Sequence, residues 1–110
     1  MKRDVLIFKE ILITIEDDLV EKGHPFELSD IDSSTLEEHL KLLEYEGLIQ
    51  VDDKKPLATG ETFYFDISLT NRGYDFIQAL KKKRIFSKLE KLKDPLRLLI
   101  PIAIDLLQKN

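Results

Sequence analysis

The sequence predicts a single α+β domain in which helices are combined with one antiparallel β-hairpin. Apolar residues recur at helical spacing in several stretches, and they alternate with polar residues over 62–69. A polar segment that contains proline and glycine precedes that alternation, as expected for a loop between two strands. The length of 110 residues fits one domain, and a hydrophobic content of 43% is enough for a packed core.

The first helix is predicted over residues 5–22. Asp4 is the expected N-cap, because its carboxylate can accept a hydrogen bond from a free backbone N–H. Gly23 and the proline that follows it supply a stop signal. The buried side of this helix is expected to carry Ile11, Ile15 and Leu19.

The second clear helix is predicted over residues 34–46. Ser34 and Glu37 have the spacing of a capping box, in which the two side chains satisfy free N–H groups at the helix start. The apolar stripe is expected to contain Leu36, Leu40 and Leu43. Residues 24–32 precede this helix, and their alternation predicts a short strand or an extended connector.

Two strands are predicted, over 48–51 and 62–69, with a loop of about ten residues between them. The strands should pair antiparallel. On the second strand, Phe63, Phe65, Ile67 and Leu69 are expected to face inward. Tyr64 and Asp66 are expected to face outward.

A further helix begins at Thr70 or Asn71 and either continues to residue 93 or breaks near Arg84. Asp94 followed by proline is a start signal, so a last helix is predicted from there to about residue 109. Pro101 should kink that helix or divide it into two pieces. We therefore expect a main domain over 1–92 and an apolar helical tail over 93–110.

The expected core joins these elements. We predict that it contains Ile11, Ile15, Leu36, Leu40, Leu43, Ile49, Phe65, Ile67, Phe76 and Leu80.

The order of these elements resembles a winged helix, the helix-turn-helix variant in which a β-hairpin forms the wing. Residues 34–49 resemble the recognition helix and first wing strand of many bacterial regulators. Residues 69–73, Leu-Thr-Asn-Arg-Gly, resemble the stretch that follows their second wing strand. More narrowly, the chain is similar to a family of uncharacterised small proteins of bacteria and their prophages, whose motif continues here as Tyr74-Asp75-Phe76. The resemblance covers residues 1–92 well and the tail less well, and it implies a winged-helix fold and no reaction. With the predicted last helix added, the expected fold is a winged helix with a C-terminal helical extension.

One departure from that pattern bears on function. A winged helix normally has a full helix before the recognition helix, and residues 24–32 allow no more than one turn there. The departure weakens the inference from fold to DNA binding.

Enzymatic chemistry has the least support in the sequence. The two histidines, His24 and His39, lie on different predicted elements and have no paired nucleophile motif. The absence of cysteine excludes disulfides and thiolate metal sites. We therefore predict no catalytic residue, metal, cofactor or small-molecule substrate. No targeting or membrane-spanning segment is recognisable, so a soluble cytoplasmic protein is expected.

DNA binding through the helix 34–46 and the wing is the first functional hypothesis. The residues expected to reach duplex DNA are Ser33, Ser34, Thr35, Lys41, Lys54 and Lys55. The electrostatics oppose it, because residues 33–46 contain four glutamates and one lysine. The alternative hypothesis is a protein-interaction or dimerisation module that has a winged-helix fold and no longer binds DNA.

The charge is distributed unevenly along the chain, and the tail is apolar on nearly all sides. Residues 1–71 carry a net charge of −10, whereas residues 72–110 carry +6. The basic stretch over 81–97 is expected to be a solvated face, a protein contact or a nonspecific nucleic-acid contact. We expect a homodimer whose centre contains Leu98, Leu99, Ile102, Leu106 and Leu107. The alternative is that the tail folds back and covers the helix around Ile85, Phe86 and Leu89.

Overall fold

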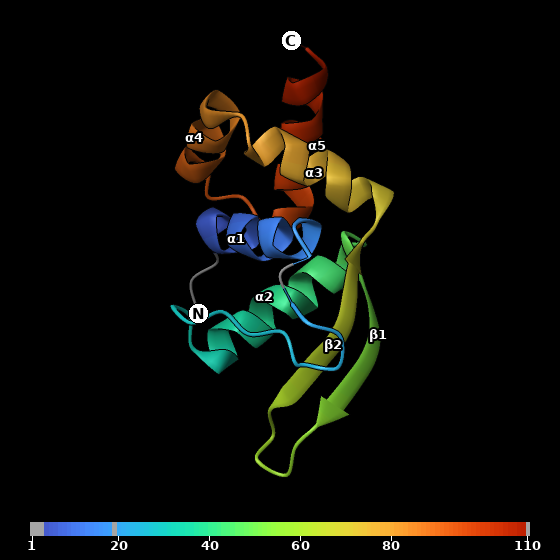
Figure 1. The fold of residues 1–110 in the computed structure, drawn as a ribbon. Coiled ribbons are helices and arrows are strands. Elements are labelled where there is room, and N and C mark those ends of the chain that lie inside the picture. The colour runs from blue at the N-terminus through green and yellow to red at the C-terminus, as the bar shows by residue number, and fades with distance from the viewer. Residues whose placement is uncertain (1–3, 19, 110) are drawn as a thin grey trace.

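A computed structural model describes residues 4–18 and 20–109 and shows five helices and one two-stranded antiparallel hairpin (Figure 1). The elements are α1 (Val5–Glu16), α2 (Ser33–Tyr45), β1 (Ile49–Pro56), β2 (Thr62–Leu69), α3 (Asn71–Leu80), α4 (Lys83–Lys91) and α5 (Leu96–Gln108). Figure 1 shows α2 and the hairpin at one end of the molecule, α3, α4 and α5 at the other, and α1 between them. The α+β class is thereby confirmed.

Helix α1 begins where the sequence predicts and ends six residues earlier than expected. The Asp4 carboxylate accepts a hydrogen bond from the N–H of Leu6 at 2.8 Å, which confirms the N-cap. The predicted end near residue 22 is wrong, because Asp18 takes a left-handed conformation with φ of 54°. Acidic residues at a helix C-terminus oppose the helix dipole, and aspartate tolerates the left-handed region. Leu19, which was expected on the buried side of this helix, lies outside the described residues.

The N-terminus of α2 is capped by Asp32 and not by Ser34 as predicted. One oxygen of the Asp32 carboxylate accepts from the N–H of Thr35 at 3.2 Å and from the Ser34 hydroxyl at 2.8 Å. Hydrogen bonds to the Asp32 carboxylate, first from the Thr35 side chain and then from the Ser34 hydroxyl and the Thr35 N–H, hold the pKa of Asp32 below its ordinary value of 3.8. The predicted capping box is wrong, since Glu37 bonds to a different element, described below.

The lowered pKa of Asp32 predicts how stability depends on pH. The carboxylate is favoured in the folded state, so its contribution is fully present above pH 3.8 and is lost as pH falls through the lower folded pKa. The variant Asp32→Asn keeps a capping oxygen on its side chain, and that oxygen does not titrate. Urea unfolding from pH 7 to about pH 2 should therefore show the wild type losing more stability than Asp32→Asn. Asp30→Asn, which removes a neighbouring exposed carboxylate, should follow the wild type; identical curves for all three proteins would contradict the cap.

The hairpin pairs β1 with β2 in a register that sets Ile49 opposite Leu69 and Pro56 opposite Thr62. The antiparallel pairing is confirmed, but β1 continues five residues beyond the predicted end at residue 51. The connecting turn is correspondingly shorter than the predicted loop, and the N–H of Leu57 donates to the carbonyl of Glu61 across it at 2.7 Å.

The prediction of which side chains of β2 face inward is wrong for the first half of the strand. Tyr64 is buried, whereas Phe63 and Phe65 are only half-buried and lie outside the main core. Asp66 explains the difference, because its φ of 52° breaks the regular alternation of the strand. Ile67 and Leu69, beyond this break, pack against the core as expected.

The segment before α2 runs beside β2 without becoming a strand. The N–H of Phe26 donates to the carbonyl of Tyr64 at 2.8 Å, and the Phe26 ring is buried. Of the two predicted possibilities, the extended connector is the one observed. No helix lies between α1 and α2 in the described part of the chain.

The C-terminal part contains the three helices α3, α4 and α5. Residues 81–82 separate α3 from α4. Of the two predicted alternatives, one helix to residue 93 or a helix that breaks near Arg84, the second is therefore observed. Pro95, and not Asp94, is the N-cap residue of α5, and no side chain caps this helix. Helix α5 is one helix through Pro101, which is exposed.

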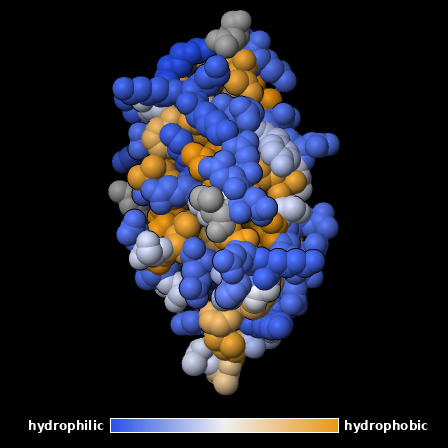
Figure 2. Space-filling view, viewed as in Figure 1, coloured by the Kyte–Doolittle hydropathy of each residue, from blue (hydrophilic) through white to orange (hydrophobic). Residues whose placement is uncertain are grey.

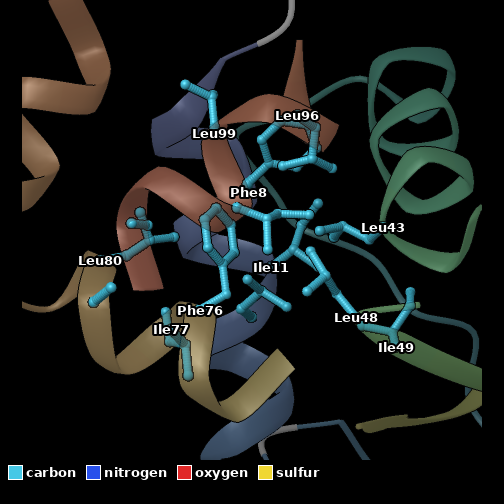
Figure 3. Packing of buried hydrophobic residues seen from close by; sticks show 14 of the residues in the cluster. Phe8, Ile11, Leu43, Leu48, Ile49, Phe76, Ile77, Leu80, Leu96 and Leu99 are labelled. Carbon is cyan, nitrogen blue, oxygen red and sulfur yellow. The ribbon is translucent and has the colours of Figure 1, made fainter. Parts of the chain in front are cut away.

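The core is continuous from the hairpin to α5, and Figure 3 shows side chains of α1, α2, α3 and α5 meeting in it. Of the predicted core residues, Ile15 and Ile67 are only partly buried, and Phe65 is outside the core. The predicted core residues that are buried are Ile11, Leu36, Leu40, Leu43, Ile49, Phe76 and Leu80. The sequence interpretation missed Phe8, Leu48, Tyr64, Ile77 and the α5 residues Leu96, Leu99 and Ile100.

Candidate interaction surface

The outer face of α2 is predominantly acidic. Ser33, Ser34 and Lys41 are exposed as predicted, and Thr35 is half-buried. The Lys41 ammonium lies 3.3 Å from the Glu37 carboxylate, and the Ser34 hydroxyl is engaged by Asp32. Two of the groups that were expected to meet phosphate, Lys41 and Ser34, therefore already have carboxylate partners.

The lysines of the hairpin are similarly occupied. The Lys54 ammonium lies 2.6 Å from the Glu44 carboxylate of α2 and 5.6 Å from the centre of the Tyr64 ring. The Lys55 ammonium lies 5.0 Å from the centre of the Phe65 ring, as in a cation–π contact. Lys54 thus joins the hairpin to α2.

The outer part of the hairpin presents apolar surface. The Phe63 and Phe65 rings lie edge to face with centroids 6.5 Å apart, and Leu57 in the turn is exposed. Figure 2 shows apolar residues gathered at the lower end of the molecule, over the hairpin. A surface of this kind is more typical of contact with a protein than with the phosphate backbone of DNA.

Glu37 joins α2 to the first residue of β2. Its carboxylate accepts from the Thr62 N–H at 2.6 Å while it also pairs with Lys41. Burial raises the pKa of the Tyr64 hydroxyl to about 12, and the charges of Glu37 and Glu44 add to this shift. Tyr64 consequently stays neutral over the physiological range. Sequence reasoning could not find the Glu37–Thr62 contact, because it joins residues that are distant along the chain.

Replacement of Glu37 tests this junction. Glu37→Ala leaves the Thr62 N–H without its acceptor and is expected to lower the free energy of unfolding by about 1–3 kcal/mol. Glu37→Gln keeps an accepting oxygen and should lose less of the free energy of unfolding. Urea unfolding at pH 7 measures both variants, with Glu38→Ala as a control on the exposed face of the same helix. Equal losses for Glu37→Ala and Glu38→Ala would contradict the junction.

The two sequence motifs that carry the family resemblance bind to each other. The Thr70 hydroxyl donates to the Gly47 carbonyl at 2.6 Å and accepts from the Gly73 N–H at 3.0 Å, so it caps α3 and holds it to the end of α2. The Arg72 guanidinium donates to the Glu46 carbonyl at 2.9 Å. These contacts assign a structural role to residues 46–48 and 70–73.

His39 is the one buried histidine, whereas His24 is exposed beside Glu21. His39 Nε2 lies 3.2 Å from the Asp4 N–H, and Nδ1 lies 2.7 Å from the Thr35 carbonyl. The two contacts indicate that Nδ1 carries the proton and donates it to Thr35. Among the described residues, no group of three or more histidine, cysteine or acidic residues could hold a metal ion.

The basic residues lie toward the other end of the molecule. The exposed cations of α4 and its flanks are Lys81, Lys82, Lys83, Arg84, Lys88, Lys91 and Lys93. Lys81 forms an ion pair with Glu16 of α1, and the Lys9 ammonium lies 4.5 Å from the centre of the Phe86 ring. The basic surface and the acidic face of α2 are thus separated in space (Figure 1).

Helix α5 packs against α3 and α4 of its own chain. Leu99, one of the predicted dimer residues, is covered by that packing and is only 3% exposed. Leu98 is 44% exposed, and Ile102, Leu106 and Leu107 are partly buried. Leu98, Ile102 and Leu106 have the i, i+4, i+8 spacing of one helix face, so a partly open apolar stripe remains on α5.

The fold and surface therefore define an α+β protein with an acidic helix–hairpin end and a basic helical end. Residues 2–94 match the family described as hypothetical protein DUF2513, and the chain belongs to this family. No curated protein and no solved structure matches the chain. The similarity to a family of uncharacterised proteins is thereby confirmed. No helix in the described part of the chain is long and apolar enough to cross a membrane.

Proposed function

We propose that the chain is a winged-helix protein that serves as a cytoplasmic protein-interaction module and has no duplex-binding surface on α2 and the hairpin. The observation that carries the proposal is the pairing of Lys41 with Glu37 and of Lys54 with Glu44. DNA binding requires cations that are free to neutralise phosphates. On this face Lys41 and Lys54 are instead paired with carboxylates of the same chain, beside further glutamates.

The winged-helix assignment is supported by the order of elements and by the place of residues 25–28. In this comparison α2 corresponds to the recognition helix and β1–β2 to the wing. The extended segment around Phe26 lies beside β2, and the chain then enters α2 without an intervening helix. The helix-turn-helix is therefore incomplete, which agrees with an interaction role for the module.

Fluorescence anisotropy on a random DNA duplex, at about 50 and 200 mM salt, tests the loss of DNA binding. We expect no binding that depends on the hairpin lysines. The matched variants are Lys54→Gln with Lys55→Gln, and Lys83→Gln with Lys88→Gln on α4. Binding that weakens steeply with salt and is abolished by the hairpin variants would overturn the proposal.

The second candidate is a DNA-binding transcriptional regulator of bacterial or prophage origin. The exposed lysines of α4 favour it, because clustered cations on one helix can hold phosphate without sequence preference. In the same anisotropy experiment, salt-dependent binding that is lost in Lys83→Gln with Lys88→Gln, and kept in the hairpin variants, would support this candidate.

As its interaction, we propose homodimerisation through the partly open stripe of α5. Removal of the whole tail would not test this cleanly, because Leu96, Leu99 and Ile100 belong to the core. Leu98→Gln changes an exposed position and should leave the fold intact. Light scattering is expected to give twice the chain mass of 12.8 kDa for the wild type and a lower mass for Leu98→Gln. One chain mass for the wild type at high concentration would end the dimer hypothesis.

A further inference from the structure

A groove of about 480 Å³ lies between the segment 26–31, the first half of α2 and the start of β2. Its apolar lining includes Leu28, Ile31, Leu36 and Phe63. The hydrogen bond from the Phe26 N–H to the Tyr64 carbonyl joins the two walls, since both residues line the groove. The volume is within the range of small-ligand and side-chain pockets.

The charge around the groove has one sign. Glu27, Glu37 and Glu61 line it, and none of the described lining residues is a lysine, arginine or histidine. Glu37 is held by Thr62 and Lys41, whereas Glu27 and Glu61 are exposed. The contact that Glu61 makes is a weak one, from the Ser33 hydroxyl at 3.5 Å. Two carboxylates are thus available to a ligand at the edge of an apolar cleft.

We infer that this groove binds a peptide segment of a partner protein in which an apolar side chain is flanked by lysine or arginine. The apolar side chain enters between Leu28, Ile31 and Phe63, and the flanking cations meet Glu27 and Glu61. Charge complementarity selects this partner, because an acidic segment would be repelled by three glutamates and a wholly polar one would leave the apolar lining exposed. The inference deepens the proposed interaction role and uses a surface separate from the α5 stripe.

Three labelled peptides probe the groove by fluorescence anisotropy with the full chain. The first alternates lysine and leucine; the second replaces leucine by serine; the third replaces lysine by glutamate. The first peptide should bind, the second should bind at least about tenfold more weakly because apolar burial is lost, and the third should not bind. Equal affinity for the first two peptides would show that only charge acts, and would overturn the inference.

Variants of the groove locate the binding. Glu27→Gln with Glu61→Gln should weaken the lysine–leucine peptide about tenfold, and Phe63→Ser should weaken it by a similar factor. Glu38→Gln removes the same charge from the outer face of α2 and should leave the affinity unchanged. Absence of binding, or an equal loss of affinity in Glu38→Gln, would overturn the assignment of the groove as the peptide-binding site. Neither result would change the mass measured by light scattering or the binding measured with duplex DNA. Failure of the groove inference is therefore distinguishable from failure of the proposed function.

Discussion

Replacement of Leu40 by alanine is expected to lower the free energy of unfolding by about 2–5 kcal/mol. Leu40 is 2% exposed and packs in the core that α2 shares with the other elements. Its loss removes the transfer free energy of the side chain and leaves a cavity among Leu36, Leu43 and their neighbours, which cannot close fully. The effect should be among the largest of any single truncation in α2.

The measurement is thermal and urea unfolding of the full chain, followed by circular dichroism. Leu57→Ala is the matched control, because it makes the same change at a position in the hairpin turn that is 37% exposed. The control should change stability by less than about 0.5 kcal/mol. A thermal midpoint that is the same for Leu40→Ala and wild type would show that α2 does not pack as described.

The parts of the fold that could be predicted are those that neighbouring residues decide. The Asp4 cap of α1 and the Thr70 cap of α3 are each made within three residues of the capping side chain. The two-residue period of β2 and the turn before it were enough to predict the hairpin. Signals of this kind involve only residues that are close together along the chain, so they can be recognised from the sequence alone.

The errors arose where two local signals competed or where one residue broke a pattern. Asp32 and Ser34 are both good N-caps, and the structure uses the aspartate while the serine donates to it. Asp66 has the left-handed φ that shifts the side-chain alternation of β2, so Tyr64 takes the buried place predicted for Phe65. A regular strand pattern contains no signal for such a break.

The candidate surface was the least predictable part, because its chemistry depends on distant pairs. The sequence correctly showed that residues 33–46 are acidic, but not that Glu44 would hold Lys54. The groove between residues 26–31 and β2 has no motif either, since its walls come from separate segments. The sequence shows where the lysines of this surface are, whereas the residues that pair with them can be identified only from the fold.

Gly73→Ala is expected to destabilise the protein by about 3 kcal/mol or more, although alanine is the better helix former. A Cβ atom at Gly73 would lie 2.0 Å from the carbonyl oxygen of Leu48 and 3.1 Å from its carbon. That oxygen accepts the Thr70 N–H at 3.1 Å and belongs to rigid backbone, so it cannot move aside as a flexible side chain would. Helix α3 must separate from the start of β1, and the Thr70 contacts to Gly47 and Gly73 are then weakened.

Urea unfolding of Gly73→Ala measures this effect, with Asp75→Ala as the control at an exposed position of the same helix. The control should change stability by less than about 0.5 kcal/mol, because an exposed substitution to alanine chiefly alters helix propensity. In Gly73→Ala the helix gains at most about 1 kcal/mol from propensity, which the backbone overlap exceeds. A Gly73→Ala protein as stable as Asp75→Ala would show that α3 and β1 do not approach so closely. The expected loss instead assigns the glycine of the Leu-Thr-x-x-Gly motif to the junction between the hairpin and the helices.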